Sequence, residues 1–320
     1  MTSRKIVDNR GVTVYAPDLQ RTYEPARADW FLPSGKKLAV SILMHAPAYM
    51  DNVPEGALKP LEMQGGVGRD TSEPRIGQVV RLSQWDFGLT VGIFRLMSIA
   101  EAVGVPFAVT LDQYGVEHAP GLAGEVGRRA PEIVARGRAA NLVFSEEISP
   151  EKELITIREC LGTIREATGR TPAGWFSPER ATSSRTHALL AQAGISWFGE
   201  WPVDETPVVV PTEPSEVVSL PFSLEAEDMF ALYTRGMRFD DYEQFLKDTV
   251  QQLLEDADIV GSRFLGLSWF GWVLGQACFA DVAERFLAWL VEQPEVEILL
   301  PSEVAPLAGR AVSADSAGGV

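Results

Sequence analysis

The chain has 320 residues, of which 46% are apolar, 22% charged and 9% aromatic, and its formal charge is −16. This composition is typical of a globular protein and excludes a disordered or fibrous one. The acidic charge repels phosphate backbones and anionic lipid, so we expect neither nucleic acid nor a membrane as a partner. Cys160 and Cys278 have no zinc-binding spacing, and no stretch resembles a signal peptide or a membrane span, which together favour a cytoplasmic protein.

Seven apolar runs rich in β-branched or aromatic residues recur along the chain. They are LAVSILM (38–44), FAVTL (107–111), AGWFS (173–177), SWFGEW (196–201), VVSLPF (217–222), FLGLSWF (264–270) and EILLP (297–301). Because the runs are continuously apolar rather than alternating, they predict strands buried on both faces, as in a parallel sheet.

Amphipathic helices are predicted between these runs. In the clearest one, Ser149 fits the N-cap, Pro150 fits the first turn and Gly169 ends the helix. Further helices are predicted over about 88–103, from about 240 to 254 and over about 280–292. Strands that alternate with helices indicate right-handed βαβ units, and seven such strands can close into a barrel.

We expect one barrel domain over residues 31–308, after an N-terminal extension (1–30) and before a disordered tail (309–320). The segments 45–84 and 201–216 are rich in Gly, Pro and acidic residues and predict long loops. Loops that follow the C-terminal ends of parallel strands build the site of a barrel enzyme.

Several longer stretches stand in a characteristic order along the chain. They are WDFGLTVGIFRLMSIAEAVGVPFAVTL (85–111), TGRTPAGWFSPERATSSRTHALLAQAGISWFGEWPVDETP (168–207), VVSLPFSLEAEDM (217–229), LSWFGWVLGQACF (267–279) and EILLPSEVA (297–305). Together they resemble the polysaccharide-deacetylase-like (NodB-homology) superfamily, in the branch that includes metal-independent allantoinase and the cyclic imide hydrolases. The resemblance implies an α/β fold with a distorted seven-stranded (β/α) barrel and hydrolysis of C–N bonds other than peptide bonds.

The chain departs from that superfamily at the metal ligands. Where metal-binding relatives carry G-H-E and then H-G-x-x-H, this chain reads RGRAANLVFSEEISP, with Arg138 in place of the first His. Trp269 stands where relatives end a strand in L-H-P. His45, His118 and His187 are the whole histidine content, so we expect no metal site, no other cofactor and no zinc-hydroxide mechanism.

Polar residues at two strand ends are the leading candidates for catalysis. His45 directly follows a buried strand, where an imidazole can act as general base or hold a substrate oxygen. The alternative is a hydrogen-bonded histidine under the 45–84 loop. Glu179 and Arg180 lie in a turn that shapes the pocket of relatives, where a carboxylate beside a guanidinium can activate water or bind an amide; the alternative is a surface pair.

Two more carboxylates follow the 217–222 strand. The resemblance places polar residues of the pocket here, and Glu225 and Asp228 can divide acid and base roles if their charges interact. Their spacing equally fits the acidic first turn of a helix. We predict His45, Glu179 and Glu225 as catalytic residues, with Asp228 binding substrate.

Tryptophans near strand ends can form a flat apolar wall for a ring or acyl substrate. These are Trp175, Trp201, Trp269 and Trp272. Core packing explains Trp175 equally well, whereas Trp269 is expected to face the pocket.

Asp86 and Arg95 belong to the segment that borders the site in relatives, so they are predicted to bind substrate together with Arg180. A structural ion pair is the alternative for Asp86 and Arg95. His118 and His187 are expected to be solvated.

The leading functional hypothesis is metal-free hydrolysis of a C–N bond in a small cyclic amide, imide or ureide. The competing hypothesis is a catalytically inactive family member that binds a ligand or pairs with an active paralogue. A zinc sugar deacetylase is the third and least favoured alternative. We expect a small-molecule substrate and, by analogy with the branch, a homo-oligomer.

Overall fold

Nine strands form one sheet in the order β10-β3-β4-β5-β6-β7-β9-β8, and β11 pairs with β3 outside this path. The strands are β3 (Leu38–Ala46), β4 (Ala108–Leu111), β5 (Glu132–Ala135), β6 (Gly174–Trp175), β7 (Trp197–Phe198), β8 (Val208–Val210), β9 (Val217–Ser219), β10 (Arg263–Phe270) and β11 (Val296–Ile298). All pairings in this sheet are parallel except that of β8 with β9.

The computed structural model describes residues 28–59, 76–77 and 79–309, together with residues 5–7, 13–15 and 24. Residues 5–7 and 13–15 form a separate antiparallel pair, β1 (Lys5–Val7) and β2 (Thr13–Tyr15). Most of the predicted N-terminal extension and residues 310–320 of the predicted tail lie outside the described residues.

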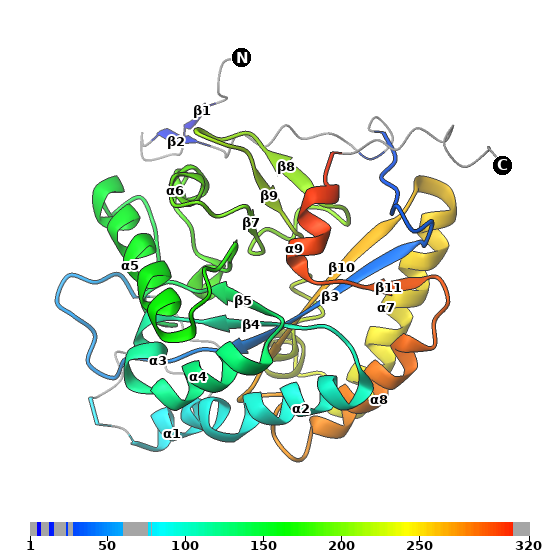
Figure 1. Ribbon diagram of the computed structural model, residues 1–320, viewed down its shortest axis with the longest axis horizontal. Helices are drawn as coiled ribbons and strands as arrows, with labels where there is room; N and C mark the ends of the chain where they lie inside the picture. Colours follow the sequence, from blue (N-terminus) through cyan, green and yellow to red (C-terminus); the bar gives the residue numbers. More distant parts are fainter. Residues whose placement is uncertain are drawn as a thin grey trace.

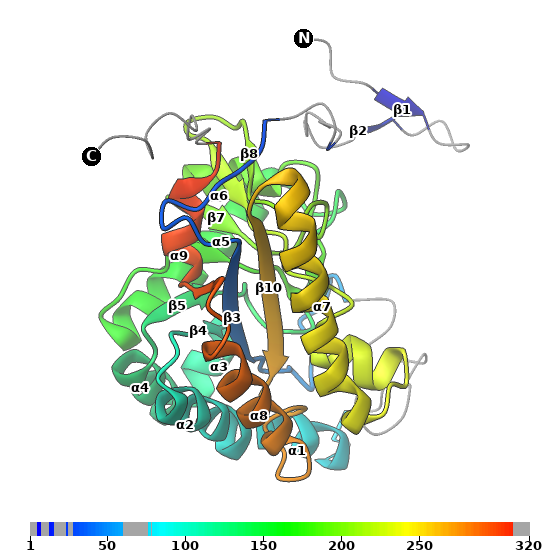
Figure 2. The same ribbon diagram turned by 90° about the vertical axis from the view of Figure 1, so that its right-hand side faces the viewer.

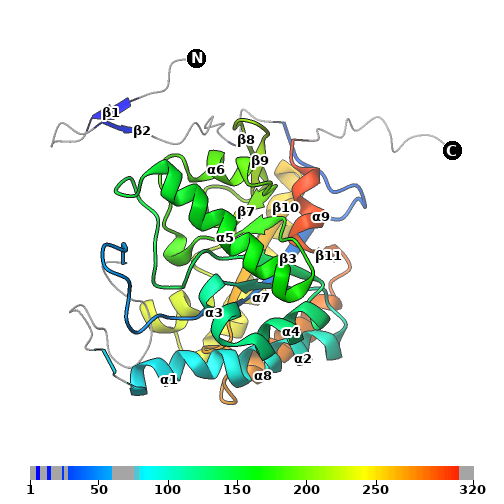
Figure 3. The ribbon, with the colours of Figure 1, turned by 60° about the vertical axis from the view of Figure 1, so that its left-hand side comes forward.

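Helices cover the outside of the curled sheet (Figure 1). They are α1 (Val79–Phe87), α2 (Ile93–Val103), α3 (Gln113–His118), α4 (Pro120–Arg129), α5 (Pro150–Thr168), α6 (Thr186–Gln192), α7 (Phe239–Val260), α8 (Ala280–Val291) and α9 (Pro301–Val304). Figure 2 shows α7 beside β10, and Figure 3 shows α5 in front of the sheet, near α4. None of the helices within the described ranges combines the length and apolarity needed to cross a bilayer.

The clearest predicted helix is confirmed at both ends. The side chain of Ser149 accepts a hydrogen bond from the Lys152 N–H, and Gly169 follows the last turn with φ 70°. Ser149 satisfies one of the free N–H groups of the first turn, and glycine adopts the left-handed conformation without strain. This helix is α5.

The prediction of seven strands is wrong in number. Each of the seven predicted runs contains a strand, but β5 and β8 were missed. β5 is only four residues long and begins with Glu132, whose buried carboxylate accepts hydrogen bonds from the Trp197 indole and from Ser302. β8 lies inside the 201–216 segment that was expected to be a loop.

The sheet curls until the chain after β9 reaches β10, where Phe222 and Gly266 form an isolated parallel bridge. A Cβ atom at Gly266 would lie 2.6 Å from the Phe222 ring, so this close approach requires glycine. Phe222 belongs to an apolar cluster inside the curl, which includes Phe176, Trp197 and Phe264. The ends of the parallel strands lie above this cluster and carry the candidate site.

Candidate active site

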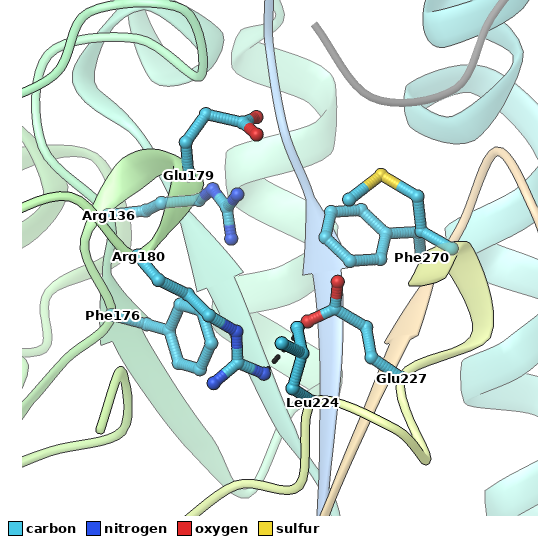
Figure 4. A pocket seen from close by; sticks show the side chains of 8 residues that line it. Arg136, Phe176, Glu179, Arg180, Leu224, Glu227 and Phe270 are labelled. Atoms are coloured by element: carbon cyan, nitrogen blue, oxygen red, sulfur yellow. Dashed lines mark hydrogen bonds and ion pairs between the residues drawn. The ribbon is translucent and has the colours of Figure 1, made fainter. Parts of the chain in front are cut away.

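A pocket of about 310 Å³, counting its open mouth, lies at the C-terminal ends of the strands. It is lined by Arg136, Phe176, Glu179, Arg180, Leu224, Glu227, Met229 and Phe270 (Figure 4). These side chains come from the segments after β5, β6 and β9 and from the last residue of β10. Two guanidinium groups, two carboxylates and two aromatic rings thus face one small space.

A strained turn after β6 presents two of these side chains. Glu179 and Arg180 have φ values of 51° and 53°, in the left-handed region that disfavours residues other than glycine. Such a conformation costs about 1–3 kcal/mol per residue and persists only where neighbours fix it. The Ser177 hydroxyl does so, because it donates to Glu200 at 2.9 Å and accepts from the Trp175 indole at 2.9 Å.

The Glu179 carboxylate has no hydrogen-bond or ion-pair partner within residues 28–59 and 79–309. Burial raises the pKa of Glu179 to about 7; the positive charge of Arg136 opposes this rise and the negative charge of Glu227 adds to it. A free carboxylate whose pKa lies near neutrality is suited to general acid–base catalysis.

Arg180 and Glu227 form an ion pair on another side of the pocket, with 2.9 Å between Nη2 and Oε2. Their side chains are 14% and 4% exposed. Arg180 also donates to the Phe222 carbonyl at 3.1 Å and lies over the Phe176 ring, 4.9 Å from its centroid. The pair is therefore a fixed, electrically neutral part of the wall.

Arg136 is a buried cation with no carboxylate partner in the part of the chain that the structure describes. The residue is 2% exposed, and its Nη1 donates to His45 Nδ1 at 2.9 Å. Its Nε is buried without a hydrogen-bond partner. The guanidinium carbon lies 5.7 Å from the Phe176 ring centroid and 5.4 Å from that of Phe270. The free donors can therefore bind an acceptor oxygen in the pocket.

His45 lies beneath Arg136 and does not line the pocket. A guanidinium can only donate, so His45 Nδ1 is unprotonated and the proton of the neutral ring is on Nε2. The ring stacks on Phe270 with centroids 4.5 Å apart, and Nδ1 lies 3.2 Å from the Thr110 hydroxyl. Burial, reinforced by Arg136 and Arg180, holds the pKa of His45 well below its usual range. The geometry gives His45 the role of holding Arg136 rather than that of a base.

The two carboxylates predicted after the 217–222 strand both lie outside the pocket. Glu225 is exposed and forms an ion pair with Arg235 at 2.7 Å. Asp228 is buried and accepts the backbone N–H groups of Met229, Phe270 and Leu274 at 2.7–3.2 Å. Burial raises the pKa of Asp228 well above its usual range. Glu227, which directly precedes Asp228, is the carboxylate of this segment that lines the pocket, and it was not predicted from the sequence.

Replacing Asp228 by Ala is expected to lower the free energy of unfolding by about 3 kcal/mol, because three buried N–H groups lose their acceptor. Urea denaturation would measure the change. Glu225→Ala, at an exposed pair, should change it by less than about 0.5 kcal/mol. Equal effects of the two substitutions would contradict the structural role of Asp228.

The tryptophans lie behind the pocket rather than in its wall. Trp269 is on the face of β10 that packs against the helices, with its ring 6.2 Å from that of Phe286 in α8. Its neighbour Phe270 points to the other face, because successive strand residues alternate, and lines the pocket instead. Trp175 supports the strained turn through Ser177, and Trp201 packs against other aromatic rings.

The remaining predicted residues also lie away from the pocket lining. Asp86 is exposed on α1, and Arg95 donates to the Gly275 carbonyl. His118 is exposed, as expected, but His187 is not: it is buried, 3.9 Å from the Phe198 ring centroid. Trp272 is buried close to Phe270 and the α1 helix.

The donors of the pocket do not fit a divalent cation. No group of three His, Cys, Asp or Glu side chains within the described residues is arranged to hold a metal ion. The two guanidiniums at the pocket would repel a metal, and one of its two carboxylates is already paired with Arg180. Arg138 forms an ion pair with Glu117 at 3.1 Å.

Known structures share this fold. A protein described as a polysaccharide deacetylase, from Mycobacterium smegmatis, superposes with a TM-score of 0.72 at 19% identity, over 88% of this chain and 93% of that one. The PuuE allantoinase gives a TM-score of 0.73 at 18% identity, over 86% and 91% of the two chains. An assigned polysaccharide deacetylase from Pseudomonas aeruginosa PAO1 gives 0.72 at 18% identity, over 86% and 92%. No protein-family model and no curated protein sequence matches the chain.

Proposed function

We propose that the chain is a polysaccharide-deacetylase-like hydrolase that cleaves a C–N bond of a small cyclic amide, imide or ureide without a metal. The proposal rests on two groups that face one pocket (Figure 4). They are the carboxylate of Glu179 and the buried guanidinium of Arg136, and neither has an ion-pair partner within the described residues. A planar amide presents a carbonyl oxygen, which can accept a hydrogen bond from Arg136, and a nitrogen in the same plane, which can receive a proton from Glu179. The shared fold and the sequence motifs support the family.

The chemistry uses the two groups in turn. Glu179 takes a proton from water, the water oxygen attacks the carbonyl carbon, and the C=O electron pair moves onto the oxygen. Arg136 stabilises that oxyanion in a site with little water. Glu179 then returns the proton to the leaving nitrogen as the C–N bond breaks. His45 serves as a positioning residue, because its Nδ1 fixes one N–H of Arg136.

Hydrolysis of hydantoin, dihydrouracil, succinimide and allantoin tests the proposal. The expected result is turnover of at least one of them, unaffected by a chelator. The active base is ionised, so kcat/KM should rise with pH through the Glu179 pKa of about 7 and level off above about pH 8.

Initial rates measured across pH would show this limb. A profile that is flat between about pH 5 and 8 would rule out Glu179 as the base. Binding of these compounds without turnover would favour the competing function, an inactive ligand-binding member of the family.

A further inference from the structure

One positive charge near the pocket has no carboxylate within ion-pair distance in the part of the chain that the structure describes. Arg136 is 2% exposed, and its hydrogen bond to His45 goes to a neutral ring. Its Nε has no acceptor. A guanidinium removed from water is unfavourable unless an anion or several acceptors replace the lost hydration. The folded chain supplies neither within its described residues.

The neighbouring carboxylates either have other partners or lie too far from Arg136 to pair with it. Glu227 neutralises Arg180 at 2.9 Å. Asp112, below the pocket, accepts the backbone N–H groups of Ala48 and Gly115 at 2.7 and 2.6 Å. Glu179 lies beyond ion-pair distance of Arg136 and is about half protonated near neutral pH. No carboxylate within the described residues therefore pairs with Arg136.

The free donors of Arg136 have the geometry that a carboxylate needs. A guanidinium has five N–H groups in one plane, and His45 uses one of them. Nε is buried, so the N–H groups of Nη1 and Nη2 that His45 leaves free are the ones that can hold a carboxylate. The rings of Phe176 and Phe270 lie near the guanidinium and limit its contact with water, which strengthens such a pair.

We propose that the substrate is an anion: a small cyclic amide, imide or ureide that carries a carboxylate on its ring, bound by the Arg136 guanidinium. The position of the scissile bond rests on the proposed function, whereas the anion site does not. Neutral rings such as dihydrouracil would then still bind, but more weakly than rings that carry a carboxylate.

Dihydroorotate and dihydrouracil test this class, because they share a ring and differ in one carboxylate. Calorimetric titration near neutral pH should show dihydroorotate binding roughly 100-fold more tightly. Arg136→Met should abolish this difference in affinity. Arg136→Lys keeps the positive charge but lacks the planar pair of N–H donors, and it should retain part of the difference. Arg138→Met is the matched control at a half-buried residue that is paired with Glu117 and does not line the pocket, and it should behave as wild type.

Equal affinities for the two rings, or a preference that survives in Arg136→Met, would overturn the proposal. Failure of dihydroorotate, succinate and acetate all to bind would do so as well. Circular dichroism establishes that each variant is folded. Dihydroorotate binding without ring opening keeps the anion site and contradicts the hydrolase; ring opening of dihydrouracil with no preference for dihydroorotate does the reverse.

Discussion

Glu179→Gln is expected to lower kcat/KM for C–N hydrolysis by about 1,000-fold, within the range that removal of a general base produces. The amide keeps the size of the side chain and can still donate and accept hydrogen bonds, but it cannot take a proton from water. Because Glu179 has no partner in the described structure, its loss leaves no buried group unsatisfied, and the fold should be retained. Steady-state rates measured on the substrate that wild type turns over give the effect, which should fall on kcat.

Glu225→Gln is the matched control for this substitution. Glu225 also follows a strand of the sheet, β9, but it is exposed and paired with Arg235 outside the pocket. Its variant should keep wild-type rates. If Glu179→Gln retained more than about a tenth of the activity, another group would have to be the base.

Arg136→Met is expected to increase the free energy of unfolding by about 1–3 kcal/mol while it abolishes activity. Replacing a buried charge that has no counter-ion by an apolar side chain of similar length removes a desolvation penalty. His45 Nδ1 keeps a hydrogen-bond partner, because it also lies 3.2 Å from the Thr110 hydroxyl. Urea denaturation of wild type and variant at one pH measures the difference.

Arg180→Met gives the contrast. It removes the partner of Glu227, whose side chain is 4% exposed, and leaves a buried carboxylate unpaired. This variant should lose about 3 kcal/mol of stability. If Arg136→Met were destabilised to a similar extent, the guanidinium would be shown to have a structural partner, and both the oxyanion role and the anion site would lose their support.

The strands of the fold could be predicted where the chain is continuously apolar. All seven such runs contain a strand, and the cap residues of α5 were predicted from residue type alone. β5 escaped prediction because it begins with Glu132, whose burial depends on distant partners such as Trp197 and Ser302. Local sequence does not reveal such partners.

Arg136 was not predicted as a site residue because the strand before it, β5, was not predicted. Arg136 directly follows β5, so a strand predicted there would have placed a basic residue at the mouth, by the same reasoning that placed Glu179 and Arg180 there. The prediction for the acidic residues after β9 was wrong for a different reason. Its backbone is irregular, and which carboxylate faces inward depends on turns that have no fixed period.

Choosing between adjacent residues of a strand is the other source of error. Trp269 and Phe270 point to opposite faces of β10, so an error of one position in the prediction assigns a core side chain to the pocket. The prediction followed the sequence resemblance, which aligned Trp269 with a histidine of the relatives. The structure places the neighbouring ring at the site.

The contact of Phe222 with Gly266 also affects how molecules enter and leave. Together with Trp197 and Phe264, Phe222 fills the interior below the pocket, which closes that side of the pocket to a ligand. Ring opening of an anionic substrate creates a second carboxylate, and the product must pass Arg136 on its way out. Such a dead-end geometry predicts that the dianionic product leaves slowly, which makes it a competitive inhibitor whose release limits turnover.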